Sequence, residues 1–371
     1  MADMIEFSMM NNDNKENNIG LIQELSNAPG VSGFEDEIVK TVCRRAKGLG
    51  ELEKDSMLNL YLRRVGGQAD GQPVLMLDAH SDEVGFMVRA IRPNGALDFH
   101  PLGSWVASNV AAHRVLVRNN CGVWLPGVVA SKPPHFYSEA EKKLSPDIAS
   151  MVIDIGASSE KEAREDYKIS VGAPVAPDVS FEYRNDNDIM IGKAFDNRLG
   201  CAAIINTFRE LAETKLEVAM TGVFAAQEEV GMRGAAVSAQ RVNPDIAIVF
   251  EGAPADDTIT EPYAVQTALK KGPMLRHIDN SMITNPRFQH FALDTALKNG
   301  IPFQEAVRTG GSTNAGVIHL AEKAVPVIVI GVPVRYIHTH HGIASYSDFE
   351  NAVKLACAII RSLNREVIAG F

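Results

Sequence analysis

The feature that most constrains the fold is a set of short, mainly apolar runs, each bounded by turn or polar residues. These runs cover residues 74–78, 218–226, 246–250 and 327–330. Because they lack the alternation of a half-exposed strand, they are typical of strands buried on both faces. Amphipathic helix patterns lie between and after them, at 198–212, 287–298, 314–322 and 347–362. This order predicts an α/β fold in which helices flank a mostly parallel, doubly wound sheet.

The pattern of apolar and polar residues changes between about residue 89 and residue 188. Short alternating segments there are separated by many turn residues, a pattern typical of half-buried strands. We therefore expect a small β-barrel domain at 89–188, inserted into a catalytic α/β domain formed by 19–88 and 189–371. A chain of 371 residues is long enough for this division. Residues 1–18 are rich in Asn and charged groups, and we expect them to be a mobile tail.

Overall charge and cysteine usage argue against several classes of protein. The formal net charge is -10 and no strongly basic run is present, which disfavours a nucleic-acid binder because phosphate neutralisation needs clustered Lys and Arg. The four cysteines lie far apart without a CxxC pair, so neither a zinc ribbon nor a disulfide framework is indicated. The N-terminus lacks the apolar region of a signal peptide, and no run approaches the roughly 20 apolar residues of a membrane span. We expect a cytoplasmic location.

Residue types that bind metals stand where the predicted strands end. They are Asp78, His80 and Asp82, then Glu228 and Glu229, then Glu251, and finally His338, His340 and His341, of which not all need be ligands. Since ligand sites in open α/β sheets form outside the carboxyl ends of the strands, we expect these side chains to lie close together. Taken singly, His80 has the alternative of a satisfied structural histidine, and the adjacent glutamates that of a solvated acidic loop.

Asp196 immediately precedes a long helix pattern, so it is either the N-cap of that helix or a carboxylate able to bridge two metals. Considered together, two imidazoles and three carboxylates from these clusters suit a paired hydrolytic site. In such sites two metals about 3.5–4 Å apart share a bridging water. One member of the adjacent glutamate pair would bind metal, and the other would act as general base. The set predicts metal-assisted amide hydrolysis.

These motifs resemble the metallopeptidase family that includes TET-type aminopeptidases, bacterial glutamyl aminopeptidases and proteins often labelled endoglucanase M. The resemblance begins near Leu21, includes an opening signature from Ser26 to Glu35, and ends near Val353. It implies a zinc-peptidase-like catalytic domain and a PDZ-like inserted domain that serves as lid and dimerisation domain. It also implies a homododecamer built from dimers, because similar proteins form hollow particles of that size.

Carried over position by position, the resemblance implies a dinuclear metallo-aminopeptidase that uses Zn²⁺ or Co²⁺. The implied ligands are His80, Asp196 and Glu251 on one ion and Glu229, Asp196 and His338 on the other, with Asp196 as the bridge. Glu228 would be the general base and Asp82 would orient His80. The implied reaction is removal of N-terminal residues from peptides, by attack of a metal-bridging water on the first peptide bond.

The sequence departs from the family pattern at Asn314, where many relatives have Asp, and we assign no ligand role to this residue. Two further histidines, His340 and His341, follow His338, and we expect both to lie on the surface or behind the ligands. The preferred N-terminal residue of the substrate stays open. Lys270, Lys271 and Arg276 could approach an acidic residue, or they could be solvated surface charges.

Other enzyme classes fit the sequence less well. It contains no HExxH, GxSxG or GxxxxGK[ST] motif. A metal-dependent deacylase or carboxypeptidase on a related scaffold is the closest alternative, because the same metal chemistry cleaves several amides. An endoglucanase needs two carboxylates and no metal, which fits a His-rich site poorly. A metal-binding protein that has lost catalysis is disfavoured by the presence of both Glu228 and Asp82.

Overall fold

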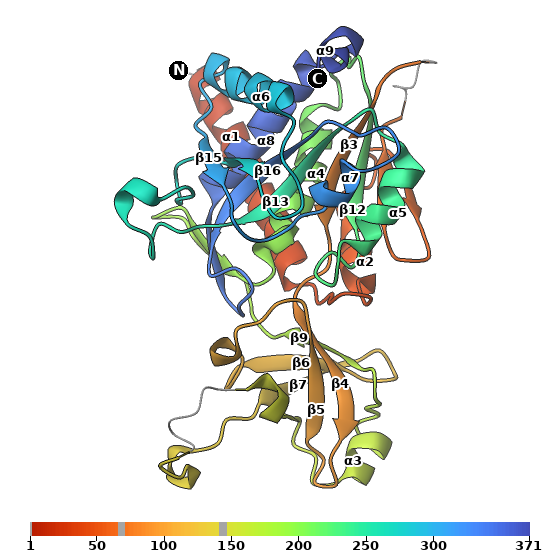
Figure 1. Ribbon diagram of the computed structural model, residues 1–371, viewed down its shortest axis with the longest axis vertical. Coiled ribbons are helices and arrows are strands. Elements are labelled where there is room, and N and C mark those ends of the chain that lie inside the picture. Colours follow the sequence, from red (N-terminus) through yellow and green to blue (C-terminus); the bar gives the residue numbers. More distant parts are fainter. Residues whose placement is uncertain (1, 66–70, 141–146) are drawn as a thin grey trace.

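A helix-covered sheet and a small barrel make up the computed structural model, which describes residues 2–65, 71–140 and 147–371 (Figure 1). The sheet occupies the upper part of this view and the barrel the lower part. The predicted α/β class with an inserted β-barrel is therefore confirmed. Among the described residues, no helix is both long and apolar enough to cross a membrane.

Four parallel strands form the centre of the large sheet, in the order β12, β3, β13 and β16. Their bounds are Ala219–Ala225, Val74–His80, Ile246–Pro254 and Val327–Arg335. They correspond to the four apolar runs of the sequence, because a strand in this position is covered on both faces. Since all four run in the same direction, their carboxyl ends lie at one edge of the sheet.

Shorter strands extend the sheet on both sides of this parallel centre, with antiparallel pairing at β2–β12, β16–β17 and β14–β16. They are β1 (Glu51–Lys54), β2 (Leu60–Arg63), β10 (Glu182–Arg184), β11 (Ile189–Gly192), β14 (Met274–Ile278), β15 (Gln304–Val307) and β17 (Gly342–Ser345). The sequence pattern did not identify these strands, because most are three to five residues long and several are partly exposed.

Helices cover both faces of the sheet, and the alternation of side chains along the strands explains how. On β3, Leu75 and Leu77 belong to the apolar cluster of one face, whereas Met76 belongs to the cluster of the other. The first face packs against α1 (Ala2–Asn27), α2 (Asp36–Arg45), α4 (Phe195–Glu210), α6 (Pro286–Lys298) and α8 (Tyr346–Ser362). The second packs against α5 (Arg233–Val242) and α7 (Ala315–Ile318). The short helix α9 (Arg365–Ala369) ends the chain.

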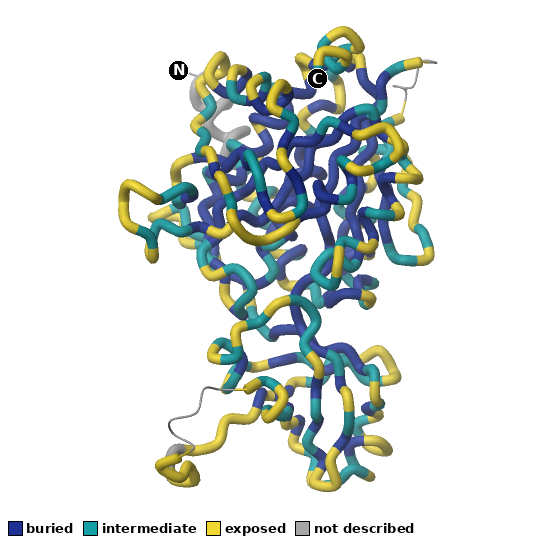
Figure 2. Tube along the Cα trace, in the orientation of Figure 1, coloured by how far each residue is buried: buried dark blue, intermediate teal, exposed yellow. Residues whose placement is uncertain are grey.

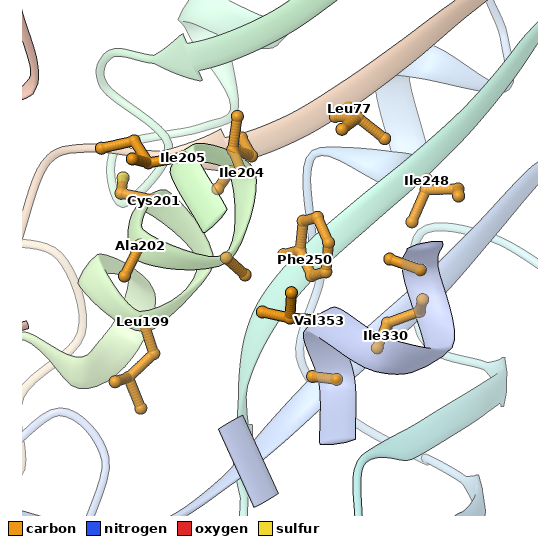
Figure 3. Packing of buried hydrophobic residues seen from close by; sticks show 14 of the residues in the cluster. Leu77, Leu199, Cys201, Ala202, Ile204, Ile205, Ile248, Phe250, Ile330 and Val353 are labelled. Atoms are coloured by element: carbon orange, nitrogen blue, oxygen red, sulfur yellow. The ribbon is translucent and has the colours of Figure 1, made fainter. Parts of the chain in front are cut away.

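The larger core lies between the sheet and α4. Figure 3 shows side chains of α4, among them Leu199 and Ile204, close to Phe250 of β13 and Val353 of α8. The trace of the chain is buried throughout the middle of this part and exposed mainly in loops and outer helix turns (Figure 2). This packing holds the carboxyl ends of the central strands in a fixed arrangement.

The barrel closes through strands in the order β4, β5, β8, β7, β6 and β9. Their bounds are Gly85–Ile91, Leu97–Leu102, Ile153–Asp154, Trp124–Val129, Arg114–Arg118 and Pro174–Pro177, and helix α3 (Glu160–Glu165) lies on the chain before β9. Alternate residues such as Phe86, Val88, Val115 and Val117 fill the interior, which is the period-two pattern seen in the sequence. The barrel follows β3 directly, so it lies beside the edge of the sheet where that strand ends.

Two elements differ from expectation. Lys15 and Asn18, which fall in the segment predicted as a mobile tail, belong to helix α1 and contact Asp188 and Tyr346. These partners are more than 170 positions away, so the local sequence does not reveal them. The helix predicted at 314–322 is reduced to Ala315–Ile318, since the chain then continues as turns.

Candidate metal centre

His80 is the last residue of β3, and only 1% of it is exposed. Its Nε2 lies 3.1 Å from Asp196 Oδ1 and 3.4 Å from Glu251 Oε1. Its Nδ1 faces Asp82 instead, 3.2 Å from the backbone oxygen. A proton on Nδ1 would leave the lone pair of Nε2 directed at the carboxylates, which is the tautomer that a metal-binding imidazole needs.

Asp196 lies at the start of α4 in a non-helical backbone conformation, φ −88° and ψ 103°. Its Oδ1 faces His80, and its Oδ2 lies 3.3 Å from Nε2 of His338. The N-cap alternative is not supported, because Asp196 makes no capping hydrogen bond; instead the amide of Gly200 donates to Oδ1 of Asn197. One carboxylate thus connects two histidines that are 258 positions apart in the chain.

Glu251 approaches this carboxylate from the neighbouring strand β13. The approach depends on Gly252, because a Cβ at that position would lie 2.7 Å from the Cα of Asp196. Glu251 is 5% exposed and its Oε2 has no hydrogen-bond partner among the described residues. A buried carboxylate oxygen without a partner is costly unless a cation or proton compensates it.

Glu228 and Glu229 follow β12, and their backbone amides donate to the two carboxylate oxygens of Asp82 at 3.0 and 3.2 Å. The side chain of Glu229 is only 3% exposed, and its Oε2 lies 3.4 Å from His338 Nε2. Its Oε1 is buried and has no hydrogen-bond partner in the described part of the chain. The alternative of a solvated acidic loop is therefore wrong for Glu229.

The pKa values of these groups reflect burial of several acids around two imidazoles. Burial raises the pKa of Glu251 well above its usual range and that of Glu229 to about 8. Burial opposes the charging of His80 and His338, but the neighbouring carboxylates, Asp196 first, raise the pKa of both imidazoles, for His338 to about 9. Without a cation, protons on the carboxyl groups and imidazoles offset the negative charge of this cluster. A bound cation would offset the same charge.

Three overlapping groups of ligand atoms each lie within 4.8 Å of one another and could hold a metal ion. They are His80, Asp196 and Glu251; Asp196, Glu229 and His338; and His80, Glu228 and Glu229. The first two share Asp196. Converging imidazole nitrogens and carboxylate oxygens, two of the oxygens buried without partners, fit a pair of divalent cations.

A cavity of about 540 Å³ opens onto these groups. Besides the acids and His338, it is lined by Arg276, Arg308 and the segment 310–313. A larger cavity of about 740 Å³ lies between α1, α4 and α8 and contains none of the clustered ligands, so we regard the smaller one as the site. Arg308 was not identified from the sequence, because no local pattern distinguishes it from a surface arginine.

Other residues singled out in the sequence lie outside the three groups. Asn314 is buried, and its amide nitrogen donates to Oδ1 of Asp78 at 2.7 Å, a contact that holds the strand β3. His340 is buried and stacks on His113 of the barrel with ring centroids 4.0 Å apart. His341, Lys270 and Lys271 are exposed, and none of them lines the cavity.

Comparison with known proteins gives one matching family model, described as M42 glutamyl aminopeptidase, over residues 59–355. The chain is 32% identical to a putative aminopeptidase, FrvX, of Escherichia coli over 360 residues, which is 95% of this chain and 98% of the relative. It is 33% identical to a glutamyl aminopeptidase of Lactococcus lactis over 350 residues, 94% and 97% of the two chains. A lysyl aminopeptidase of Pyrococcus furiosus is 29% identical over 347 residues, 92% and 96% of the two chains.

Similar structures include a TET aminopeptidase from a Thaumarchaeota archaeon, with a TM-score of 0.91, 35% identity and coverage of 96% and 99% of the two chains. The TET1 peptidase of Pyrococcus horikoshii, described as able to assemble into a tetrahedron or a large octahedral shell, has a TM-score of 0.83 and 28% identity, with 93% and 100% covered. A Thermotoga maritima protein labelled endoglucanase has a TM-score of 0.74 and 30% identity, with 94% and 98% covered.

Proposed function

Because the chain belongs to the M42 glutamyl aminopeptidase family, we propose that it is a dinuclear metallo-aminopeptidase that works with two divalent ions, Zn²⁺ or Co²⁺. The observation that carries this proposal is Asp196, whose two oxygens face the imidazoles of His80 and His338. His80 and Glu251 would complete the ligands of one ion, and Glu229 and His338 those of the other.

Two divalent ions bound there would polarise the carbonyl of the first peptide bond and activate a water for attack. Glu228 is the proposed general base, because it lines the cavity without belonging to either of the groups that share Asp196. Burial raises the pKa of Glu228 to about 7, near the pH at which a base combines the correct protonation state with sufficient basicity. Its carboxylate would take the proton of the attacking water and deliver it to the departing amine.

Asp82 is proposed to position both sides of the centre. Its carboxylate accepts from the amides of Glu228 and Glu229 and from the hydroxyl of Ser32, and it lies 3.4 Å from Nδ1 of His80. One buried side chain therefore orients a proposed ligand and the segment that carries the proposed base.

A free α-amino group on the substrate separates this proposal from a deacylase or carboxypeptidase. We expect hydrolysis of aminoacyl p-nitroanilides and of short peptides from their N-terminus, with kcat/KM falling roughly 100-fold or more when the amino group is acetylated. The measurement is a parallel assay of leucyl and N-acetyl-leucyl substrates with the zinc-loaded protein. Equal hydrolysis of both, or preferential hydrolysis of the acetylated one, would contradict an aminopeptidase.

Residues lining the cavity favour an acidic N-terminal residue. Apart from the side chains proposed for the metal centre and its base, the charged side chains of the described lining are Arg276 and Arg308. Arg276 pairs with Asp279 and Arg308 with Asp256, and the Nε of each arginine has no partner in the described part of the chain. A glutamate side chain would be attracted to these two guanidinium groups, whereas a lysine side chain would be repelled by them.

Substitution of Arg308 by Gln tests this preference. We expect kcat/KM for a glutamyl substrate to fall roughly 10- to 100-fold, since a hydrogen bond to a charged group contributes about 1.5–3 kcal/mol. The value for a leucyl substrate should stay within about threefold. Arg335→Gln is a matched control, because Arg335 pairs with Asp257 and does not line the cavity. If wild-type protein prefers lysyl over glutamyl substrates, the acidic preference is wrong although the aminopeptidase activity stands.

Assembly and location are part of the same proposal. A homododecamer built from dimers is supported by the likeness to the Pyrococcus horikoshii TET1 peptidase, which is described as able to assemble into a tetrahedron or a large octahedral shell. Ile259 and Tyr263, on the loop between β13 and β14, are 82% and 92% exposed in the single chain, as expected of residues that a neighbouring subunit would cover. Cytoplasmic location stays a prediction from the sequence.

A further inference from the structure

The turn after β12 that carries Glu228 and Glu229 has an unusual set of hydrogen bonds. Each of its four successive backbone amides donates to a side-chain oxygen from a distant part of the chain, rather than to another backbone group. The pairs are Ala226 with Asn59 Oδ1 (2.8 Å), Gln227 with Glu35 Oε1 (3.0 Å), Glu228 with Asp82 Oδ1 (3.0 Å) and Glu229 with Asp82 Oδ2 (3.2 Å). The carbonyls of Ala226, Gln227 and Glu228 accept from backbone amides of residues 231–234, so side chains bind the donors of this turn and the backbone binds its acceptors.

Glu35 is the acid of this set to which the sequence assigns no role, since Asp82 is expected to orient His80 and Asn59 is an amide. It lies at the N-terminus of α2 with no exposed surface, and its Oε1 also accepts from the amide of Gly33 at 2.9 Å. Its Oε2 is buried, with no hydrogen-bond partner among the residues that the structure describes. Burial, followed by repulsion from Asp82, raises the pKa of Glu35 to about 8, and its Oε1 can accept hydrogen bonds in either protonation state.

The backbone of Gln227 needs such a partner. It has a φ of +55°, in the left-handed region that residues other than glycine rarely adopt. This conformation turns the chain immediately before Glu228, so it determines the direction in which Glu228 leaves the strand. Without an acceptor for its amide, Gln227 would lose a contact that holds it there, and the commoner conformations at negative φ would compete.

We propose that Glu35 is a positioning residue for the hydrolysis reaction, because its Oε1 holds Gln227 and thereby aims the Glu228 carboxylate into the cavity. Glu35 itself does not line the cavity and belongs to none of the three candidate ligand groups. The inference rests on the proposed function of Glu228 as general base. It assigns to a residue at the start of α2, almost 200 positions from Glu228, a part in the reaction.

Two substitutions of Glu35 by residues of similar size distinguish the effect of its hydrogen-bond acceptor from the effect of its ionisable group. Glu35→Gln keeps a side-chain oxygen and removes the ionisable group, whereas Glu35→Met fills the same space without an acceptor. With zinc-loaded protein and a glutamyl substrate, we expect Glu35→Met to lower kcat roughly 10- to 100-fold, since small misplacements of a catalytic group have effects of this size. Its KM should stay within about threefold, and Glu35→Gln should keep kcat within about threefold of wild type.

Zinc binding by the metal-free proteins supplies a readout that does not depend on turnover. The amides of Glu228 and Glu229 stay bound to Asp82 in both variants, so we expect calorimetric zinc affinities within about threefold of wild type. Glu37→Gln is the matched control, because Glu37 is an acid on the same helix whose partner, Lys40, lies on the surface. If Glu35→Met fails to fold, Glu35→Asp takes its place, because the shorter side chain moves the acceptor away from Gln227 by one carbon. We expect Glu35→Asp to lower kcat less than the loss predicted for Glu35→Met and to leave zinc affinity unchanged.

Three outcomes would overturn the inference while leaving the proposed function intact. They are an unchanged kcat in Glu35→Met, an equal loss in Glu35→Gln and Glu35→Met, and a loss of zinc affinity that parallels the loss of kcat. The second would assign the effect to charge, and the third to the ligand Glu229. A zinc-loaded wild-type protein that hydrolyses no aminoacyl substrate would overturn the proposed function, and this inference with it.

Discussion

Glu228→Gln is expected to lower kcat by roughly 10²- to 10⁴-fold, the usual contribution of a general base, while zinc binding and the fold are retained. The amide of Gln has the same shape as the carboxylate but cannot take a proton from the attacking water. Glu228 is outside the two groups that share Asp196, so its substitution leaves both sets of ligand atoms complete. The measurement is kcat on an aminoacyl substrate together with calorimetric zinc binding.

Glu229→Ala is the informative comparison, because this neighbour is placed differently. Its carboxylate faces His338 at 3.4 Å and belongs to a candidate ligand group. We therefore expect Glu229→Ala to weaken zinc binding as well as to abolish hydrolysis. A Glu228→Gln protein with wild-type kcat would contradict the assignment of the base, and a Glu229→Ala protein with unchanged zinc affinity would contradict the assignment of the ligand.

Removal of metal is the second large effect. We expect a strong chelator to reduce hydrolysis to background and added Zn²⁺ or Co²⁺ to restore it, because the three clustered carboxylates and two imidazoles have no other proposed role. The metal-free protein should also melt at a lower temperature, since an ion that binds only the native state stabilises it by mass action. Activity and thermal melting should be followed over the same zinc titration.

A control separates the metal centre from general effects of the chelator. Asp196→Ala removes the carboxylate shared by two groups, so its melting temperature should respond much less to zinc than that of wild type. Added Mg²⁺ should restore less activity, because imidazole ligands favour Zn²⁺ and Co²⁺ over a hard oxygen-seeking cation. Hydrolysis that persists at full strength in the chelator would rule out the metal mechanism.

Only the strands of the sheet that are buried on both faces were predictable from the sequence. The runs that became β3, β12, β13 and β16 were identified because a strand covered on both faces needs apolar residues at every position. The shorter flanking strands carry no such signal, because their residues alternate or are exposed. The helix expected at 314–322 forms only four residues, since turns and not helix hydrogen bonds continue beyond Ile318.

Part of the candidate site was also predictable, and for a related reason. Parallel strands that are neighbours in a sheet end at the same edge, so acids and histidines that follow such strands are brought together whatever the details of packing. That argument placed His80, Glu229, Glu251 and His338 at one edge. It left Asp196 undecided, because a carboxylate before a helix is equally typical of an N-cap.

The sequence by itself determined which edge of the sheet carries the site and which residue types meet there. Only the tertiary structure decided which oxygen of Asp196 faces which histidine, that Arg308 lines the cavity, and that Glu35 holds the turn before Glu228. The physical reason is the distance along the chain over which each signal acts and the direction of each side chain. Apolar periodicity is a local property of the chain, whereas these contacts join residues far apart and depend on where each side chain points once the core has packed.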